Sequence, residues 1–419
     1  MLWAVTIVLA EVPSGALADL VGRRRLVIGA AALMVVELAT IGFIPLGNPD
    51  WILAAFVVNR ICSGLAEAAA SGADEALAYD SLVEAGFPDQ WPLVLERLGR
   101  LTSIAMFVAM ITGALVYDRE IMGAVLGAFG FAGPIPQSSL IRIPVLMTLV
   151  SACFALLTAW RMREVGETPP APDLSSVRTA FRQVLGTGRW ILSAPFVLLV
   201  ILGGLALDSV ARQFVLLGSE YFRLVSIPTY LLGPISACAA LFGIVSARIS
   251  RVLVTTCRPT TNFLILSLVV GASLFGLGLG IPYWGALFAL GPFLVLSAVG
   301  FMQSHYINAE VESSRRATAL SYKGLALNVG MGLASIYYAG LLRALGAEGA
   351  ARDVVFFPAL TWLVPYFAVL AAGVLLLGLF LLRGGTERPG AGPSEPDTPE
   401  AEGASLEQEG LDAPAPPAG

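Results

Sequence analysis

The fold of this 419-residue chain is decided by the stretch Gly15-Ala16-Leu17-Ala18-Asp19-Leu20-Val21-Gly22-Arg23-Arg24-Arg25, which lies between two apolar runs. Its glycines permit a tight connection and a close approach of the flanking helices. Asp19 supplies an acceptor on the buried side, and three consecutive arginines hold a loop to one face of a membrane. The stretch therefore predicts a short loop between two membrane-spanning helices.

The composition is that of a membrane protein. Hydrophobic residues make up 57% of the chain, charged residues make up 13%, and the mean hydropathy is +0.79, whereas soluble domains carry about 25% charged residues. Four cysteines without paired short spacing and a single histidine support neither a disulfide framework nor a metal site. We expect an all-α polytopic membrane protein with no cofactor, no metal and no nucleic-acid partner.

Several apolar runs have the length, roughly 17 to 25 residues, that crosses a hydrocarbon core about 30 Å thick. The eleven runs cover residues 1–18, 26–46, 51–73, 101–118, 140–160, 191–217, 228–248, 261–280, 284–305, 318–342 and 359–382. With the Arg23 loop in the cytoplasm, most arginines outside the runs also fall on the cytoplasmic side, as the positive-inside rule requires. This predicts a multi-pass protein of the inner (plasma) membrane.

A long polar segment divides the runs into two halves. The expected parts are a first-half bundle (1–160), a cytoplasmic linker (161–190), a second-half bundle (191–383) and an acidic tail rich in Pro, Gly and Ala (384–419). The tail should be disordered and cytoplasmic. Apolar residues at helical spacing opposite Arg178 and Arg182 predict a linker helix in the membrane interface, with a plain connector as the alternative.

These features together resemble the major facilitator superfamily. The family's loop signature, G-x-L-a-D-r-x-G-r-k, is matched by six residues and departs at Leu20; the matching residues are Gly15, Leu17, Asp19, Gly22, Arg23 and Arg24. The segment Ser71 to Leu82 looks like the cytoplasmic end of the family's fourth helix. The resemblance covers Met1 to about Arg383 and implies two pseudo-symmetric helical bundles.

An internal repeat supports the two halves. Gly243 to Arg251 is a decayed copy of the loop signature, with Ala247 where Asp19 stands in the first half. Tyr306 to Thr318 likewise occupies the place that Tyr79 to Arg97 has in the first half. Repeated halves of this kind are what a rocking transporter needs.

The eleven runs fall one short of the family's twelve. The chain begins inside what resembles the second helix of the family, which gives five plus six. We expect a misassigned start codon or a fragment. The alternatives are a true eleven-helix protein and a signal peptide, since Ala16-Leu17-Ala18 imitates a cleavage site, but no basic segment precedes it and Glu11 interrupts the apolar run.

The resemblance implies conformational control by the Gly15–Arg25 loop. Asp19 and the arginines would brace the cytoplasmic side while the halves face outward. A carboxylate near helix ends can accept charge-assisted hydrogen bonds that rocking must break and remake. The simpler interpretation is that the arginines only enforce topology.

Ionisable residues inside membrane spans are costly, which makes them candidates for the substrate path. Arg60 lies near the middle of the third run, and Glu67 and Asp74 follow it at intervals of seven, which places the three roughly on one helical stripe. We expect Arg60 to face the substrate path, as an anion contact or as the partner of a carboxylate. A structural ion pair is the alternative, and Asp74 is expected at the interface.

Other ionisable residues inside the runs are further candidates. Asp208 and Arg212 stand four apart in the sixth run, as a local pair or as cavity residues. Glu37 is alone near the middle of the second run, as a proton-carrying carboxylate or a satisfied packing contact. Glu11 is expected to belong to the polar network of the Gly15–Arg25 loop.

The sequence thus predicts a secondary transporter. We expect a monomer that moves a small solute through the lipid bilayer by alternating access, driven by an ion (proton) gradient. An enzyme is not expected, because neither HExxH nor GxSxG occurs. The remaining alternatives are a sensor or a degenerate, non-transporting relative.

Overall fold

The computed structural model describes residues 2–45, 47–128, 130, 137–165, 174–228, 231–346 and 352–381. Helices and turns make up these residues, and no strand occurs among them. The expected disorder of the tail at 384–419 and most of the proline-rich start of the linker lie outside the described residues.

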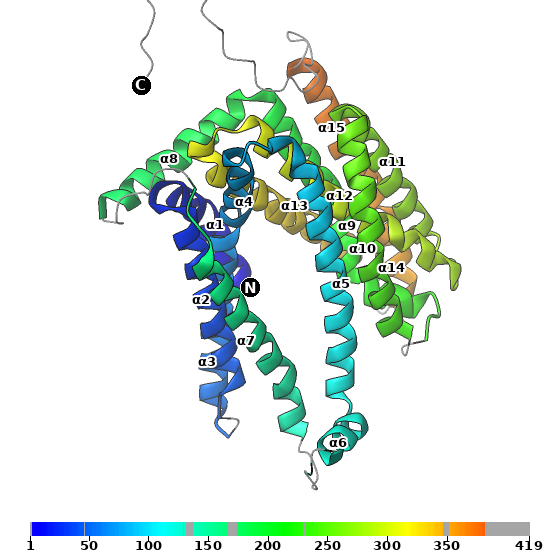
Figure 1. Cartoon of the computed structure of the whole chain (residues 1–419). Helices are drawn as coiled ribbons and strands as arrows, with labels where there is room; N and C mark the ends of the chain where they lie inside the picture. The colour runs from blue at the N-terminus through cyan, green and yellow to red at the C-terminus, as the bar shows by residue number, and fades with distance from the viewer. Residues whose placement is uncertain are drawn as a thin grey trace, which may run out of the picture.

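Helix α8 divides the chain into a first half and a second half (Figure 1). The first half contains α1 (Leu2–Val21), α2 (Arg23–Gly42), α3 (Pro49–Ala70), α4 (Ala73–Glu84), η1 (Pro88–Gln90), α5 (Trp91–Tyr117), α6 (Arg119–Ala128) and α7 (Gln137–Arg161). The linker helix is α8 (Leu174–Ser193). The second half contains α9 (Pro195–Leu224), α10 (Leu232–Thr256), α11 (Pro259–Gly278), η3 (Trp284–Ala289), α12 (Leu290–Glu310), η4 (Ser313–Arg315), α13 (Arg316–Leu345), α14 (Arg352–Thr361) and α15 (Leu363–Leu381).

Nine helices among the described residues are long and apolar enough to cross a membrane. They confirm a multi-pass membrane protein, but the expected count of eleven is not confirmed. The expected spans at 1–18 and 101–118 are helical, as α1 and α5, without being among these nine. The linker helix predicted from the sequence is present as α8.

Two glycines set the helix boundaries around the predicted loop. Gly22 has φ 107° between α1 and α2, a conformation that favours glycine. The first N–H groups of α2, which have no partner within the helix, donate to Glu164, from Arg23 at 3.0 Å and from Arg24 at 3.1 Å. Gly72 has φ 78° and separates α3 from α4.

The break at Gly72 corrects one expectation. Asp74 lies in the first turn of α4, whereas Arg60 and Glu67 lie on α3. The three residues therefore do not share one continuous helical stripe, because the left-handed residue between the helices changes the direction of the chain.

The apolar core is concentrated in the second half. Helix α9 packs against α12, α13 and α15, and the largest buried cluster is built almost wholly from second-half residues. In the first half α5 packs chiefly on α10 of the second half (Figure 1). A helix preceding Met1 stays a prediction.

Candidate functional site

Asp19 joins the two halves through a helix terminus. Its Oδ1 accepts the backbone N–H of Ala317 at 3.1 Å, and its Oδ2 accepts the backbone N–H and the hydroxyl of Thr318 at 2.9 and 2.7 Å. These are the first residues of α13, where N–H groups lack partners and the helix dipole is positive. A carboxylate of the first half therefore caps a helix of the second. We call the end of the bundle that holds this contact the loop end.

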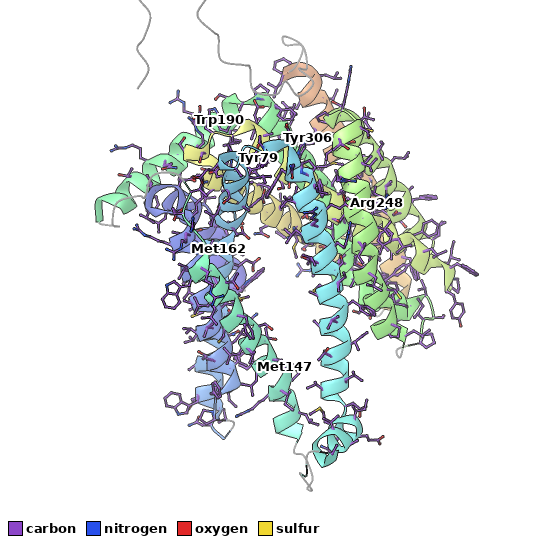
Figure 2. All side chains as sticks on the ribbon, in the orientation of Figure 1. Tyr79, Met147, Met162, Trp190, Arg248 and Tyr306 are labelled. Atoms are coloured by element: carbon purple, nitrogen blue, oxygen red, sulfur yellow. The ribbon has the colours of Figure 1, made fainter. Side chains whose placement is uncertain are left out.

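Four charged residues form a buried cluster around this contact. Arg23 pairs with Asp19 at 3.1 Å and also with Asp80, and Asp80 pairs in turn with Arg316 of the second half. Each side chain is at most 9% exposed. The ring of Tyr79 lies 4.7 Å below the Arg316 guanidinium, at the loop end (Figure 2). We call Asp19, Arg23, Asp80 and Arg316 the buried gate.

The remaining residues of the loop signature have different surroundings. A Cβ added to Gly15 would lie 2.3 Å from the Ser321 hydroxyl of α13, so glycine permits the close approach of α1. Arg24 donates instead to the carbonyl of Trp160 at 2.7 Å, within the first half. Leu17 is half-buried. Gly15 and Gly22 thus shape the backbone, and Asp19 and Arg23 make the contacts between the halves.

A second charged cluster joins α5 to α10. Glu96 pairs with Arg100 of its own helix at 2.9 Å and with Arg251 of the second half at 2.6 Å. Arg251 follows Ala247 by four residues, as Arg23 follows Asp19. The decayed repeat pointed to this place, but the sequence gave no sign that Glu96 was the partner. We call Glu96, Arg100 and Arg251 the lateral gate.

A third polar group also joins the halves. Glu75 accepts hydrogen bonds from Lys323 at 2.9 Å and from Asn308 at 2.7 Å, both from the second half. The hydrogen bonds and ion pairs between the halves named so far lie in this loop-end part of the bundle, and one further hydrogen bond reaches inward from it to Asn328. These contacts fasten the halves to each other at the loop end.

A polar chain crosses between the halves beyond the gates. Ser71 and Asn328 donate to Glu11 at 3.0 and 3.1 Å, from α3's end and from α13 respectively. Arg212 of α9 lies 3.5 Å from the Asn328 oxygen and pairs with Asp208 at 2.7 Å. The expected Asp208 and Arg212 pair is present, and Arg212 also reaches a second helix.

Glu67 completes this group from the first half. The side chain is exposed, accepts a hydrogen bond from the Trp3 indole, and lies in the fields of Arg212 and Glu11. We call Glu11, Glu67, Asp208, Arg212 and Asn328 the central network. It brings together carboxylates, a guanidinium and an amide, which can bind a polar solute or take up a proton.

Some of these residues gave no clear signal in the sequence. Asn328 is a neutral polar residue in an apolar helix, and Ser71 follows the last residue of α3. An amide or a hydroxyl at such a place is common enough to attract no notice. Glu11 was expected to support the Gly15–Arg25 loop, and it instead lies in the central network.

Arg60 and Glu37 lie apart from the central network, between α2 and α3. Arg60 donates to the Asn59 oxygen at 2.9 Å, and the Asn59 amide donates to the Glu37 carbonyl at 3.1 Å. The Glu37 carboxylate accepts a hydrogen bond from Ser63 and lies in the field of Arg60. The pair thus lies within the first half. No group of three metal-ligating side chains occurs among the described residues.

Comparisons with known proteins find similarity in structure. No protein-family model and no curated protein matches the chain by sequence. A bacterial homologue of the iron transporter ferroportin, in an outward-facing state with soaked iron, superposes with a TM-score of 0.61 at 15% identity, covering 91% of this chain and 88% of that one. The human organic anion transporter MFSD10 (TETRAN) has a TM-score of 0.57 at 16% identity and coverage of 91% and 82%.

The nucleoside transporter NupG is a further structural neighbour, with a TM-score of 0.51 at 13% identity and coverage of 90% and 89%. These structures have the major facilitator fold. Together with the helical, strand-free architecture of the described residues, they confirm the fold class expected from the sequence, apart from the count of eleven helices.

Proposed function

We propose that this protein is a secondary active transporter that moves a small solute by alternating access. The observation that carries the proposal is the arrangement of the contacts between the halves. The ion pairs of the two gates fasten the loop end, and the hydrogen bond between Asn328 and Glu11 reaches inward from it. The central network lies at that inner limit, with Glu67 exposed. A membrane-embedded polar site beyond a closed end is what one state of such a transporter requires.

In this proposal the loop end is cytoplasmic and the membrane is the inner membrane. The arginine distribution supports that orientation. The structure then corresponds to a state closed toward the cytoplasm. Opening to the cytoplasm separates α1 from α13 and α5 from α10, which breaks both gates and the hydrogen bond between Glu11 and Asn328.

The proposed roles in the central network follow from exposure and partners. Arg212, whose side chain is 33% exposed, and the exposed Glu67 contact the solute or the coupling ion. Asp208, with a side chain only 4% exposed, positions Arg212. Glu11 carries its charge next to a contact that must break during transport, so it is the residue we propose for coupling to a proton gradient. Arg60 and Glu37 are proposed as a supporting pair.

The test is uptake by the purified chain in proteoliposomes, with and without a pH gradient. The probes are labelled members of four chemical classes: a divalent transition metal ion, an organic anion, a nucleoside and a sugar. We expect uptake of at least one class, reduced at least tenfold by Arg212→Gln and by Glu67→Gln. Glu312→Gln, which changes an exposed pair with Arg315 outside the network, serves as the control.

A second measurement covers the case in which the probes miss the true solute. Spin labels on Met162→Cys and on the native Cys257, with the other three cysteines replaced by serine, report the distance between the loop ends of the two halves. Both sites lie at helix ends of the loop end, one in each half. An alternating transporter shows two distance populations. A single population together with no uptake of any probe contradicts the proposal and favours a sensor.

A further inference from the structure

The linker helix α8 lies across the line where the two halves meet. It packs on α1 of the first half and on α13 of the second. Its inner face buries Ala180, Thr187 and Ile191. A helix that contacts both halves on one face must slide or lift when they separate, so its position is linked to the state of the gates.

Polar contacts fix α8 to the buried gate. The Gln183 amide donates to the carbonyl of Ser314 at 3.0 Å and lies 3.4 Å from Asp19 Oδ2. The Tyr322 hydroxyl of α13 donates to the carbonyl of Val184 at 3.0 Å. Arg315 stacks on the ring of Trp190 at 5.1 Å, at the loop end (Figure 2). Thus α8 holds residues of the second half beside the carboxylate that caps α13.

The outer face of α8 has two adjacent stripes. Phe181, Leu185 and Leu192 are 59%, 75% and 71% exposed, and at 100° per residue they fall within one narrow sector. Arg182 and Arg189 are exposed on the next sector. Neither arginine has an acidic partner among the described residues, so their charge is available to an external group.

The surroundings of α8 indicate what this face meets. Helix α9, which is apolar enough to span the membrane, begins at Pro195, two residues after α8 ends. This places the end of α8 at the depth where the bilayer begins. Apolar side chains beside arginines at that depth are typical of a helix lying in the headgroup region of an anionic membrane.

We propose that the outer face of α8 binds anionic lipid headgroups and that this binding favours the state in which the loop end is closed. Arg182 and Arg189 take the lipid phosphates, and Phe181 and Leu185 enter the acyl boundary. The bound leaflet holds α8 against the bundle, and Gln183 keeps its place beside Asp19. The bilayer thereby acts on the equilibrium between the two states.

The test compares the full chain in nanodiscs of phosphatidylcholine with nanodiscs that also contain phosphatidylglycerol. The Met162→Cys and Cys257 label pair measures the ratio of closed to open states. We expect phosphatidylglycerol to raise that ratio, by roughly fivefold or less for each arginine engaged. Arg182→Gln with Arg189→Gln should abolish the increase, and Phe181→Ser with Leu185→Ser should reduce it.

The matched control is Arg161→Gln with Arg163→Gln, which removes two exposed arginines at the end of α7 and leaves α8 unchanged. This control should keep the lipid response. The proposal is overturned if phosphatidylglycerol leaves the ratio unchanged, if the α8 variants respond like the unaltered chain, or if the control pair loses the response equally.

Two additions make the result specific. Native mass spectrometry should show fewer retained phosphatidylglycerol molecules for the arginine variant, and undiminished retention would contradict lipid binding by α8. The ratio of closed to open states can be measured without a transported solute. A failure to find uptake would therefore count against the proposed function and not against lipid binding by α8. Equal thermal unfolding temperatures in detergent would show that the variants fold.

Discussion

The buried gate and the lateral gate have the same plan in two different environments. Each places a first-half carboxylate, Asp80 or Glu96, between an arginine of its own half and an arginine of the other. The buried-gate side chains are at most 9% exposed, whereas Arg100 and Arg251 are 50% and 36% exposed. Removing one member of a buried cluster leaves charge without compensation, while an exposed arginine exchanges its partner for water.

The repeat explains where the gates diverge. Asp19 caps α13, but the equivalent position holds Ala247, which cannot cap a helix. Ala247 instead packs closely on α5, since a Cβ added to Gly99 would lie 2.9 Å from its methyl group. The first copy of the signature thus contacts the other half through charged groups. The second copy contacts it through close packing and one ion pair. We infer that the buried gate sets the energy of the closed state and that the lateral gate adjusts it.

The largest effect is expected from Asp80→Asn. The change leaves the buried guanidinium groups of Arg23 and Arg316 without their shared carboxylate, and removing one partner of a buried pair costs about 3 to 5 kcal/mol. The Met162→Cys and Cys257 label pair should show mostly open loop ends, and the unfolding temperature should fall. Glu312→Gln, in an exposed pair, should change neither. If the two variants have the same open fraction and the same unfolding temperature, burial does not decide how much an ion pair contributes to closure.

Much of the buried gate could be predicted from the sequence. The signature indicated Asp19 and Arg23, and the repeat matched the segments that hold Asp80 and Arg316. The pairing of those two residues, more than two hundred positions apart in the chain, could not be read, because periodicity shows which face a residue lies on and not which helix it meets.

Only part of the central network could be predicted from the sequence. Asp208 and Arg212 were visible because charge inside an apolar run is rare. Asn328 was not, although it links Arg212 to Glu11. Arg60 and Glu67 share a helix, yet the structure divides them between two groups, since their neighbours on α2 and α9 differ.

The second largest effect is expected from Gly99→Ala, which tests the close packing at the lateral gate. The added methyl group meets the Cβ of Ala247, and overpacking costs about 1 to 3 kcal/mol. The label pair should shift toward the open state. Combining Gly99→Ala with Ala247→Gly restores the volume and should restore the closed population.

Gly113→Ala is the matched control on the same helix. A Cβ there has no neighbour within 4 Å, so alanine should be neutral or stabilise α5 by up to about 1 kcal/mol through its helix propensity. If the double variant Gly99→Ala with Ala247→Gly does not restore the closed population, direct packing between α5 and α10 is not what holds these helices together.

A smaller effect is expected from Glu96→Gln. Its arginine partners are half-exposed and can be hydrated when the carboxylate is lost, so the cost should be about 1 kcal/mol. The open fraction should rise by less than for Asp80→Asn under the same conditions. A shift as large as that of Asp80→Asn would mean that the two gates contribute equally to closure.

The smallest effect is expected from salt. Salt distinguishes the two gates because it weakens the exposed ion pair of the lateral gate and leaves the buried gate almost unchanged. Added sodium chloride screens exposed charges strongly and buried charges weakly. In the unaltered chain, high salt should therefore weaken the Glu96 and Arg251 pair by less than about 1 kcal/mol and raise the open fraction slightly. Glu96→Gln should lose this response, because its ion pair is absent. The label pair measures the open fraction of both chains over the same salt titration. If Glu96→Gln keeps the full response, the salt-sensitive contact is the buried gate and not the lateral gate.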